Sequence, residues 1–214
     1  NIYHLFSSLH TYAAHANFVN GLDMADHDGV LKAWREKVRH DLVRPTTVFQ
    51  RWGRDMINSY SGIRSNPGPI TLAARDFQAF ARVMPHSEFP SGSACLCKAY
   101  QEFVDAFVSH YYNAETLGPL KFRCGDKFVN GLPIPENDPR IGIEGCDIFN
   151  ITIFIETMSE LSSQCSNSRL WGGMHFTAST SAGESLCTGI GQLAFERARS
   201  LRNNSNAYEA GYRV

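Results

Sequence analysis

The chain has 214 residues and a formal net charge of −1, with 43% hydrophobic and 19% charged residues. This composition excludes an intrinsically disordered protein, because the hydrophobic content is high and the net charge is low. Twenty basic residues balance twenty-one acidic ones, so the overall charge gives no support for a nucleic-acid or membrane-surface partner. No apolar run reaches the roughly 18 residues of a membrane-spanning helix. We therefore expect a globular protein in which any anion site is local.

The length fits a single domain covering residues 1–214. The chain begins at Asn1 and shows no signal segment, so we expect a processed or trimmed start. Glycosylation sequons at Asn150 and Asn203, with an even number of cysteines, favour a secreted, disulfide-stapled glycoprotein. The alternative is a set of buried, reduced thiols. The six cysteines permit three disulfides in any of 15 pairings: Cys95, Cys97, Cys124, Cys146, Cys165 and Cys187.

Apolar residues recur mostly at helical spacing and predict an all-α helical bundle. Asp28 is a candidate cap for a first helix, which should end near Leu42 because Pro45 disfavours helical geometry at Arg44. Further helices are predicted over residues 71–83, 92–112 and 182–201.

The remaining segments are less regular. Residues 113–146 are rich in Gly and Pro and predict a long ordered loop. Residues 147–161 carry apolar residues at every second position, as in a strand, but they also fit a helix, and the surrounding helices favour the latter. The polar tail, residues 202–214, should be loosely held.

Three separate segments contain residues suited to binding an anion. In the first, Lys37 and Arg44 are seven positions apart, so a continuous helix would place them on one face. Alone, such a pair is more often solvent-exposed. In the second, Ser91, Gly92 and Ser93 precede a buried helix, whose N-terminal N–H groups attract anions. A simple Ser N-cap is the alternative.

The third segment contains Arg169 and His175, six residues apart. They lie about 240° apart on an ideal helix, so the Gly172-Gly173 pair would have to bend the chain for both to reach one ligand. A packed core histidine is the alternative interpretation. Each segment is ambiguous alone, but their order and spacing together form a recognisable pattern.

The pattern Lys-x6-Arg-Pro, Pro-Ser-Gly, Ser-Arg-x3-Gly-x-His resembles the signature shared by vanadium-dependent haloperoxidases and type-2 phosphatidic acid phosphatases. The surroundings, residues 86–90 and 168–176, are most similar to the algal and bacterial bromoperoxidase-like branch. The resemblance spans residues 30–180, with 74 residues between Ser93 and Ser168. Because members of this family carry additional helices before the Lys-Arg segment, we expect the chain to be the C-terminal part of a longer haloperoxidase-like protein.

The resemblance implies a vanadate cofactor, with hydrogen peroxide and halide as substrates; phosphate could occupy the same site. By this resemblance His175 bonds the metal, Lys37, Arg44 and Arg169 neutralise the vanadate oxygens, and Ser91 and the Gly92 N–H contribute further hydrogen bonds. A homo-oligomer, or an assembly with other haloperoxidase-like chains, is also consistent with it.

The sequence departs from the family pattern at two positions. Ser93 stands where the family has a histidine that handles protons, and serine does not titrate near neutral pH. Proton transfer would then fall to water, His86 or His40. Ser179 stands where the family often has an aspartate that orients the metal-binding imidazole, so weaker ligation is expected.

Two other functions stay open at this point. A phosphatase would use His175 as a nucleophile, and it would need both residues missing at Ser93 and Ser179. A secreted structural or assembly module with a degenerate pocket would account for the cysteines, the sequons and both substitutions.

Overall fold

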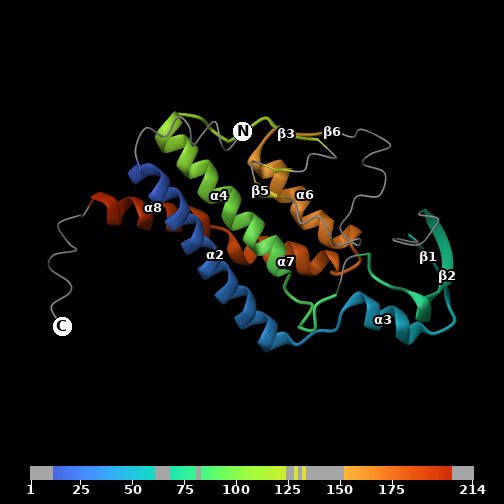
Figure 1. The fold of residues 1–214 in the computed structure, drawn as a ribbon. Coiled ribbons are helices and arrows are strands. Elements are labelled where there is room, and N and C mark those ends of the chain that lie inside the picture. The colour runs from blue at the N-terminus through green and yellow to red at the C-terminus, as the bar shows by residue number, and fades with distance from the viewer. Residues whose placement is uncertain are drawn as a thin grey trace.

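The computed structural model describes residues 12–60, 68–80, 83–123, 128–129, 132–133 and 152–203. These residues form an α-helical bundle, as Figure 1 shows. The predicted fold class is therefore confirmed. The bundle helices are α2 (Tyr12–His40), α4 (Gly92–Tyr112), α6 (Met158–Trp171), α7 (Thr177–Cys187) and α8 (Ile190–Asn203).

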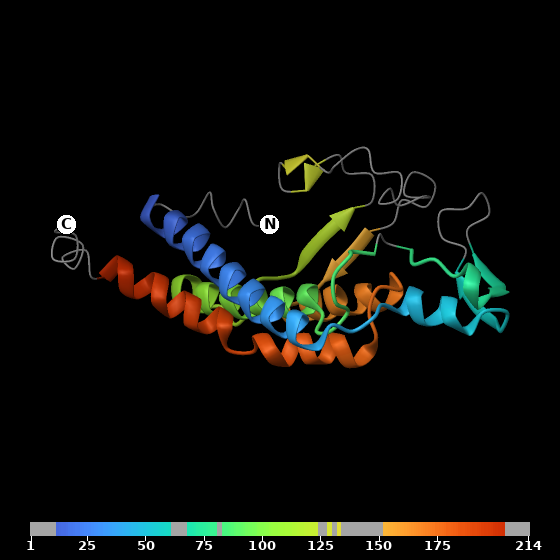
Figure 2. The same cartoon turned by 90° about the horizontal axis from the view of Figure 1, so that it is seen from below.

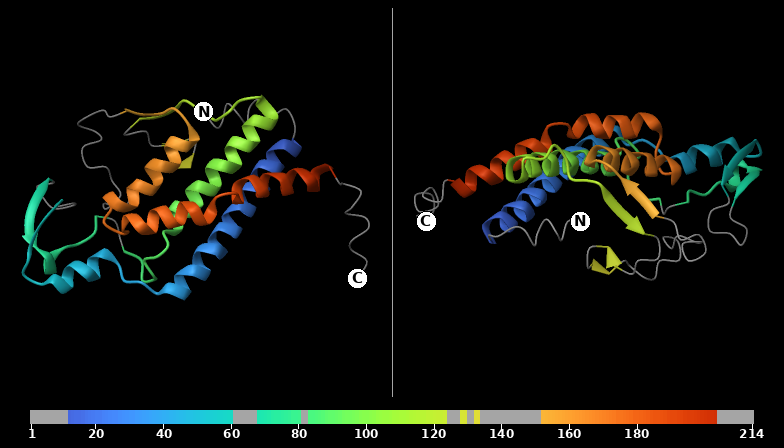
Figure 3. Two further views of the ribbon diagram at one scale, coloured as in Figure 1. Left: turned by 180° about the vertical axis from the view of Figure 1, so that it is seen from behind. Right: turned by 90° about the horizontal axis from the view of Figure 1, so that it is seen from above.

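Helix α4 lies at the centre of the bundle and packs against α2, α6, α7 and α8 (Figures 1 and 3). Its limits match the predicted helix over residues 92–112. Ser91 caps its start by accepting a hydrogen bond from the Ala94 N–H at 3.3 Å, and Asn113 ends it in a left-handed conformation with φ 52°.

Four phenylalanines join α2, α4 and α8 in the core. Phe18 of α2 packs edge-on against Phe103 and Phe107 of α4, with ring centroids 5.6 and 4.9 Å apart. Phe195 of α8 contacts the same two rings, with centroids 6.2 and 6.4 Å away. All four are at least 94% buried, so this cluster contributes much of the hydrophobic stabilisation of the bundle.

Glycines allow α7 and α8 to approach the backbone of α4 closely. A Cβ atom on Gly183 would lie 2.3 Å from the Ser91 carbonyl oxygen, and one on Gly191 would lie 2.1 Å from that of Ala99. No larger residue fits either position without moving a helix. The first of these contacts sets α7 directly against the start of α4.

A short helix and a hairpin extend from one end of the bundle, as Figure 2 shows. They comprise α3 (Pro45–Trp52), β1 (Met56–Tyr60), β2 (Pro69–Ala73) and the 3-10 turn η1 (Ala74–Asp76). The predicted helix over residues 71–83 is therefore wrong. Residues 69–73 pair antiparallel with β1, and this non-local pairing outweighs the helical spacing of a few apolar residues.

A second strand pair lies beside α6. Strand β3 (Leu120–Arg123) pairs antiparallel with β6 (Thr152–Ile155), and the dipeptide strands β4 (Phe128–Val129) and β5 (Leu132–Pro133) pair with each other. The helix predicted over residues 147–161 is wrong for residues 152–155, where the period of two marks a strand. Helix α6 begins only at Met158, after the N-cap Thr157. Most of the predicted loop over residues 113–146 lies outside the described residues.

The limits of the outer helices also differ from the prediction. Asp28 does not cap α2; it lies inside this helix, whose apolar stripe continues upstream through Phe18, Leu22 and Ala25. The predicted helix over residues 182–201 is two helices, since Gly189 with φ 87° separates α7 from α8. Residues 204–214 of the predicted tail lie outside the described residues.

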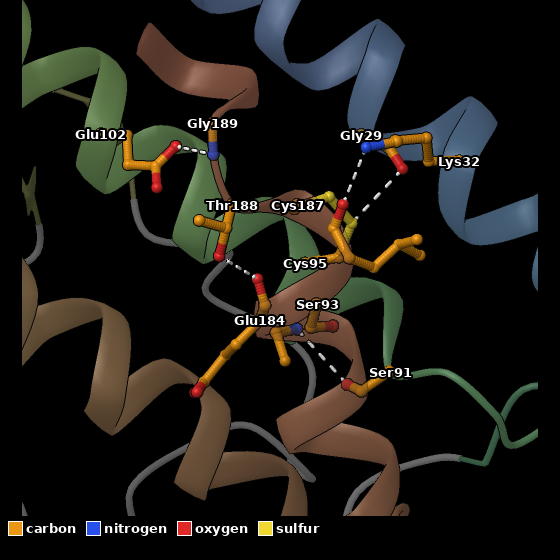
Figure 4. Close-up of a disulfide and its surroundings, with 12 residues drawn as sticks. Gly29, Lys32, Ser91, Ser93, Cys95, Glu102, Glu184, Cys187, Thr188 and Gly189 are labelled. Carbon is orange, nitrogen blue, oxygen red and sulfur yellow. Dashed lines mark hydrogen bonds between the residues drawn. A yellow bond between two sulfur atoms is a disulfide. The ribbon is translucent and has the colours of Figure 1, made fainter.

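Two disulfides fasten α4 to its neighbours, and both join distant cysteines. Cys95 bonds Cys187 at the end of α7, fully buried beside α2, where the Cys95 Sγ lies 3.5 Å from the Gly29 carbonyl oxygen (Figure 4). Cys97 bonds Cys165 of α6. The other two cysteines and the sequon at Asn150 lie outside the described residues, as does most of the sequon at Asn203.

Within the described ranges, no helix is both long and apolar enough to cross a membrane.

Candidate functional site

The ends of five helices meet around one cavity of about 840 Å³. These are the end of α2, the starts of α3, α4 and α7, and the end of α6. Six of the seven site residues expected from the sequence line it: Lys37, Arg44, Gly92, Ser93, Arg169 and His175. The structure therefore brings together three segments that are distant in the sequence.

Lys37 lies in the last turn of α2 and is 3% exposed. Its Nζ donates hydrogen bonds to the backbone oxygens of Ser87 at 2.8 Å and Glu88 at 3.4 Å. Burial, reinforced by the positive charge of Arg44, lowers the pKa of Lys37 to about 8. A bound anion would favour the charged form of this amine.

Arg44 reaches the same place as Lys37, but not along a shared helical face. Helix α2 ends at His40, Asp41 takes a positive φ of 44°, and Arg44 lies in extended backbone at the start of α3. Arg44 is 7% exposed. Its guanidinium donates hydrogen bonds to the backbone oxygens of His86, Ser87 and Met174. Both cations therefore depend on the segment just before α4.

The Gly-Gly pair bends the chain between Arg169 and His175, as the sequence predicted. Helix α6 ends at Trp171, and Gly173 has φ 69°, a conformation that favours glycine. The backbone N–H of His175 then donates back to the Arg169 carbonyl oxygen at 3.3 Å. Both side chains consequently face one cavity, although on a straight helix they would point apart.

The serines at the start of α4 have different environments. Ser91 is fully buried, its hydroxyl is engaged as the N-cap, and it is not among the residues that line the cavity. Gly92 and Ser93 do line it, so the cavity meets the first turn of a 21-residue helix, where the helix dipole is positive. Figure 4 shows Ser91 and Ser93 next to the buried disulfide that holds this turn in place.

The imidazole of His175 is 8% exposed and has a partner on each nitrogen. Nε2 lies 2.9 Å from an Arg44 amino nitrogen, and Nδ1 lies 3.0 Å from a carboxylate oxygen of Glu88. Burial lowers the pKa of His175, whereas the hydrogen bond to Glu88 raises it, and the net shift is downward. The imidazole is therefore neutral near neutral pH.

Sequence reasoning missed Glu88, the carboxylate beside His175. It is 2% exposed and also accepts hydrogen bonds from the Phe176 N–H and the Ser179 hydroxyl. Burial raises the pKa of Glu88, but the hydrogen bonds from His175, Ser179 and Phe176 outweigh it and lower the pKa overall. Ser179 was expected to weaken ligation because it replaces the family's aspartate. Glu88 offsets this loss, since it brings a carboxylate to the imidazole from another segment. The available signal was a glutamate next to the apolar Phe89-Pro90.

The two histidines considered for proton transfer are placed differently. His86 lines the cavity, its Nδ1 is 3.2 Å from an Arg44 amino nitrogen, and burial lowers its pKa. His40 is exposed, packs edge-on against Phe89 and contacts the Glu36 carboxylate at 3.4 Å. Of these two, His86 alone is next to the cations of the cavity.

An apolar wall faces these polar groups. Trp34, Phe80, Leu96, Trp171 and Met174 line the cavity together with them. A volume of about 840 Å³ lies within the range of small-molecule sites and exceeds what one oxyanion needs. The cavity therefore has room for a second small molecule beside an anion.

The charges of the cavity favour an anion. Lys37, Arg44 and Arg169 contribute three positive charges, Glu88 contributes one negative charge, and His175 is neutral, which leaves a formal charge of +2. A buried oxyanion is stable only where fixed charges and hydrogen bonds replace its water shell. This arrangement meets that requirement.

Comparisons with known proteins agree with the helical fold. Residues 17–204 match the family model described as the VCPO second helical-bundle domain. No curated protein matches the chain significantly.

Among solved structures, the chain is similar to a holo-type bacterial vanadium-dependent chloroperoxidase, with a TM-score of 0.67 and 24% sequence identity over 86% of this chain. The apo-type form matches with a TM-score of 0.65. A bacterial vanadium-dependent iodoperoxidase matches with a TM-score of 0.50 and 15% identity, over 83% of this chain and 32% of its own. The chain spans only 36% of the chloroperoxidase chain, and at these identities the structural likeness shows the fold. On the match to the family model, the chain belongs to the vanadium-dependent haloperoxidase family.

Proposed function

We propose that the chain binds vanadate in this cavity and uses it to oxidise halide with hydrogen peroxide. The observation that carries the proposal is the convergence of Lys37, Arg44, Arg169 and His175 on one cavity at the start of α4.

The residues present fit an oxyanion with one bond to nitrogen. Lys37, Arg44 and Arg169 would hold the oxygens, the first N–H groups of α4 at Gly92 would donate to them, and His175 Nε2 would bond the metal. Binding at Nε2 would replace its present contact with Arg44 and free that amino group for the anion. The Ser91 hydroxyl already serves as the N-cap of α4, so we assign it to holding the helix start in place.

When bound, vanadate supplies a Lewis acid that activates hydrogen peroxide for the two-electron oxidation of halide to hypohalous acid. The cations of the chain stabilise the negative charge that builds up on oxygen during this step.

Proton transfer is assigned to His86 in place of the histidine that Ser93 replaces. His86 lies in the cavity wall, and its lowered pKa keeps the imidazole neutral and able to accept a proton. The Ser93 hydroxyl can form a hydrogen bond with a reacting group, but it neither gains nor loses a proton near neutral pH.

Vanadate-dependent halogenation of a phenol dye tests the proposal. We expect activity with vanadate, peroxide and bromide or iodide, and none after His175→Ala. A general acid–base residue typically contributes 10²- to 10⁴-fold, so His86→Ala should lower turnover by about 100-fold or more. His40→Ala removes an exposed histidine outside the cavity and should leave turnover unchanged. An inert holo-protein would exclude haloperoxidase activity of this chain.

Phosphatase chemistry is the second candidate, and one observation favours it. Glu88 supplies the carboxylate partner that a nucleophilic His175 needs. The proton donor expected at Ser93 is still missing, however, which disfavours departure of an alcohol. Hydrolysis of p-nitrophenyl phosphate without vanadate, abolished by His175→Ala, would support the phosphatase over the haloperoxidase.

We also propose that the chain works in an oxidising compartment. The support is the two disulfides among the described cysteines, because such bonds persist mainly in secreted proteins.

A homo-oligomer, or an assembly with other haloperoxidase-like chains, is also part of the proposal. Analytical ultracentrifugation would test it.

A further inference from the structure

The Glu88 carboxylate connects the segment before α4 to the start of α7. Its Oε1 accepts hydrogen bonds from His175 Nδ1 at 3.0 Å and from the Phe176 N–H at 2.9 Å. Its Oε2 accepts a hydrogen bond from the Ser179 hydroxyl at 2.5 Å. All three donors therefore come from one short stretch of chain around His175.

The contacts on the two ring nitrogens of His175 define one tautomer. Arg44 stays protonated in proteins and has no acceptor, so it must donate to Nε2 across the 2.9 Å contact. In a neutral imidazole one nitrogen then accepts and the other carries the proton. The proton is consequently on Nδ1 and is donated to Glu88, which leaves the Nε2 lone pair directed toward the cations of the cavity.

The backbone of Glu88 is fixed as firmly as its side chain. Its N–H donates to the Leu42 carbonyl oxygen at 2.8 Å, and its own carbonyl accepts from Lys37 Nζ at 3.4 Å. The carboxylate is thus built on the same segment that holds Lys37 and Arg44. A shift of this segment would move the cations and the imidazole together.

We propose that Glu88 is the positioning residue of His175, which sets its tautomer and directs Nε2 at the anion. The identity of the group that Nε2 meets rests on the proposed function, but the tautomer does not. A merely structural role, in which the carboxylate only anchors α7, would leave the tautomer unchanged when Glu88 is replaced.

The first experiment needs no variant and no vanadate. Nitrogen-15 NMR of the histidines in the whole chain, with His175 assigned by comparison with His175→Ala, reports which ring nitrogen carries the proton. We expect the Nδ1-protonated form to dominate for His175 near neutral pH. Dominance of the Nε2-protonated form would overturn the proposal, whether or not the chain binds vanadate.

The second experiment removes the acceptor. Glu88→Ala leaves the Arg44 contact on Nε2 but removes the acceptor for the Nδ1 proton, so it should lower the Nδ1-protonated population. It should also weaken vanadate binding about 10- to 100-fold, the usual effect of losing the partner of a metal-bound histidine. Glu88→Gln keeps an acceptor oxygen and should restore most of the Nδ1-protonated population. An unchanged tautomer and an unchanged vanadate affinity in folded Glu88→Ala protein would contradict the proposal. If Glu88→Ala does not fold, Glu88→Gln serves as the test instead. A shifted tautomer in Glu88→Gln would then contradict the proposal, because this variant keeps an acceptor oxygen.

Ser179→Ala is the matched control. It removes another hydrogen bond from the same carboxylate but leaves the contact between Glu88 and His175 in place. We expect its tautomer to match that of the unmodified chain, and its vanadate affinity to stay within about 3-fold, well below the loss expected for the outer-shell partner itself. If Ser179→Ala changes the tautomer as much as Glu88→Ala does, the tautomer does not depend on the contact between Glu88 and His175, and the proposal fails. Failure of the unmodified chain to bind vanadate, with the expected tautomer present, would refute the proposed function alone.

Discussion

Substitution of Arg44 by lysine tests how strongly the cavity depends on a planar guanidinium. Arg44 makes five polar contacts, to the backbone oxygens of His86, Ser87 and Met174 and to the rings of His86 and His175, at 2.9–3.3 Å. The Ser87 oxygen also accepts from Lys37, so four acceptors depend on Arg44, and a lysine with three donors leaves at least one of them without a partner. Each buried acceptor left unsatisfied costs about 1–3 kcal/mol. We therefore expect Arg44→Lys to lower the free energy of unfolding by at least about 1–3 kcal/mol.

Urea denaturation with the disulfides intact measures this loss. Arg39→Lys is the control, because the Arg39 side chain is 69% exposed and its ion pair among the described residues is a 3.8 Å contact with Glu36. A surface pair of this kind is worth about 0–1 kcal/mol, so the control should differ little from the unmodified chain. Equal unfolding free energies for the two variants would refute the inference that Arg44 is held by its contacts.

Three further predictions concern the helix contacts and the charge of the cavity. Gly183→Ala would place a methyl group 2.3 Å from the Ser91 carbonyl oxygen, and such overpacking should cost about 1–3 kcal/mol in thermal unfolding; an unchanged midpoint would show that α7 does not lie against the start of α4. Replacing Cys97 and Cys165 by serine removes a disulfide between residues 68 positions apart and should destabilise the chain by up to about 4 kcal/mol. An unchanged urea midpoint would mean that this disulfide does not form. The lowered pKa of Lys37, about 8, means that the free protein holds this amine charged below that pH and must take up a proton to bind an anion above it. Phosphate affinity, measured by calorimetry, should therefore fall as the pH rises from about 8 toward 10.5, and Lys37→Arg should flatten this dependence; equal slopes for both proteins would exclude Lys37 as the cause.

The sequence predicted the helix α4 and six of the residues that line the cavity, because these depend on local signals. Helix α4 has a continuous apolar stripe, a serine cap and a following asparagine, all readable within one segment. Gly173 was recognised as the bend that lets His175 turn back toward Arg169, since positive φ is local to one residue.

The features that the sequence did not predict depend on distant partners. Residues 69–73 form a strand only because Met56–Tyr60 lies alongside, and single-segment periodicity does not contain that pairing. Likewise, the donors to Glu88 lie 87–91 positions further along the chain, so its role follows from the packing of α7 against α4. The predicted extent of the domain, residues 1–214, stays a prediction, as does the place of the chain in a longer protein.

A crystal structure of the protein grown with orthovanadate, with vanadium located by its anomalous scattering, tests the central claim most directly. The account predicts one vanadium atom bonded to His175 Nε2, its oxygens contacted by Lys37, Arg44 and Arg169, and Arg44 turned away from Nε2. Vanadium bound elsewhere, or an intact hydrogen bond between Arg44 and His175 at vanadate concentrations that saturate the protein in solution, would contradict it.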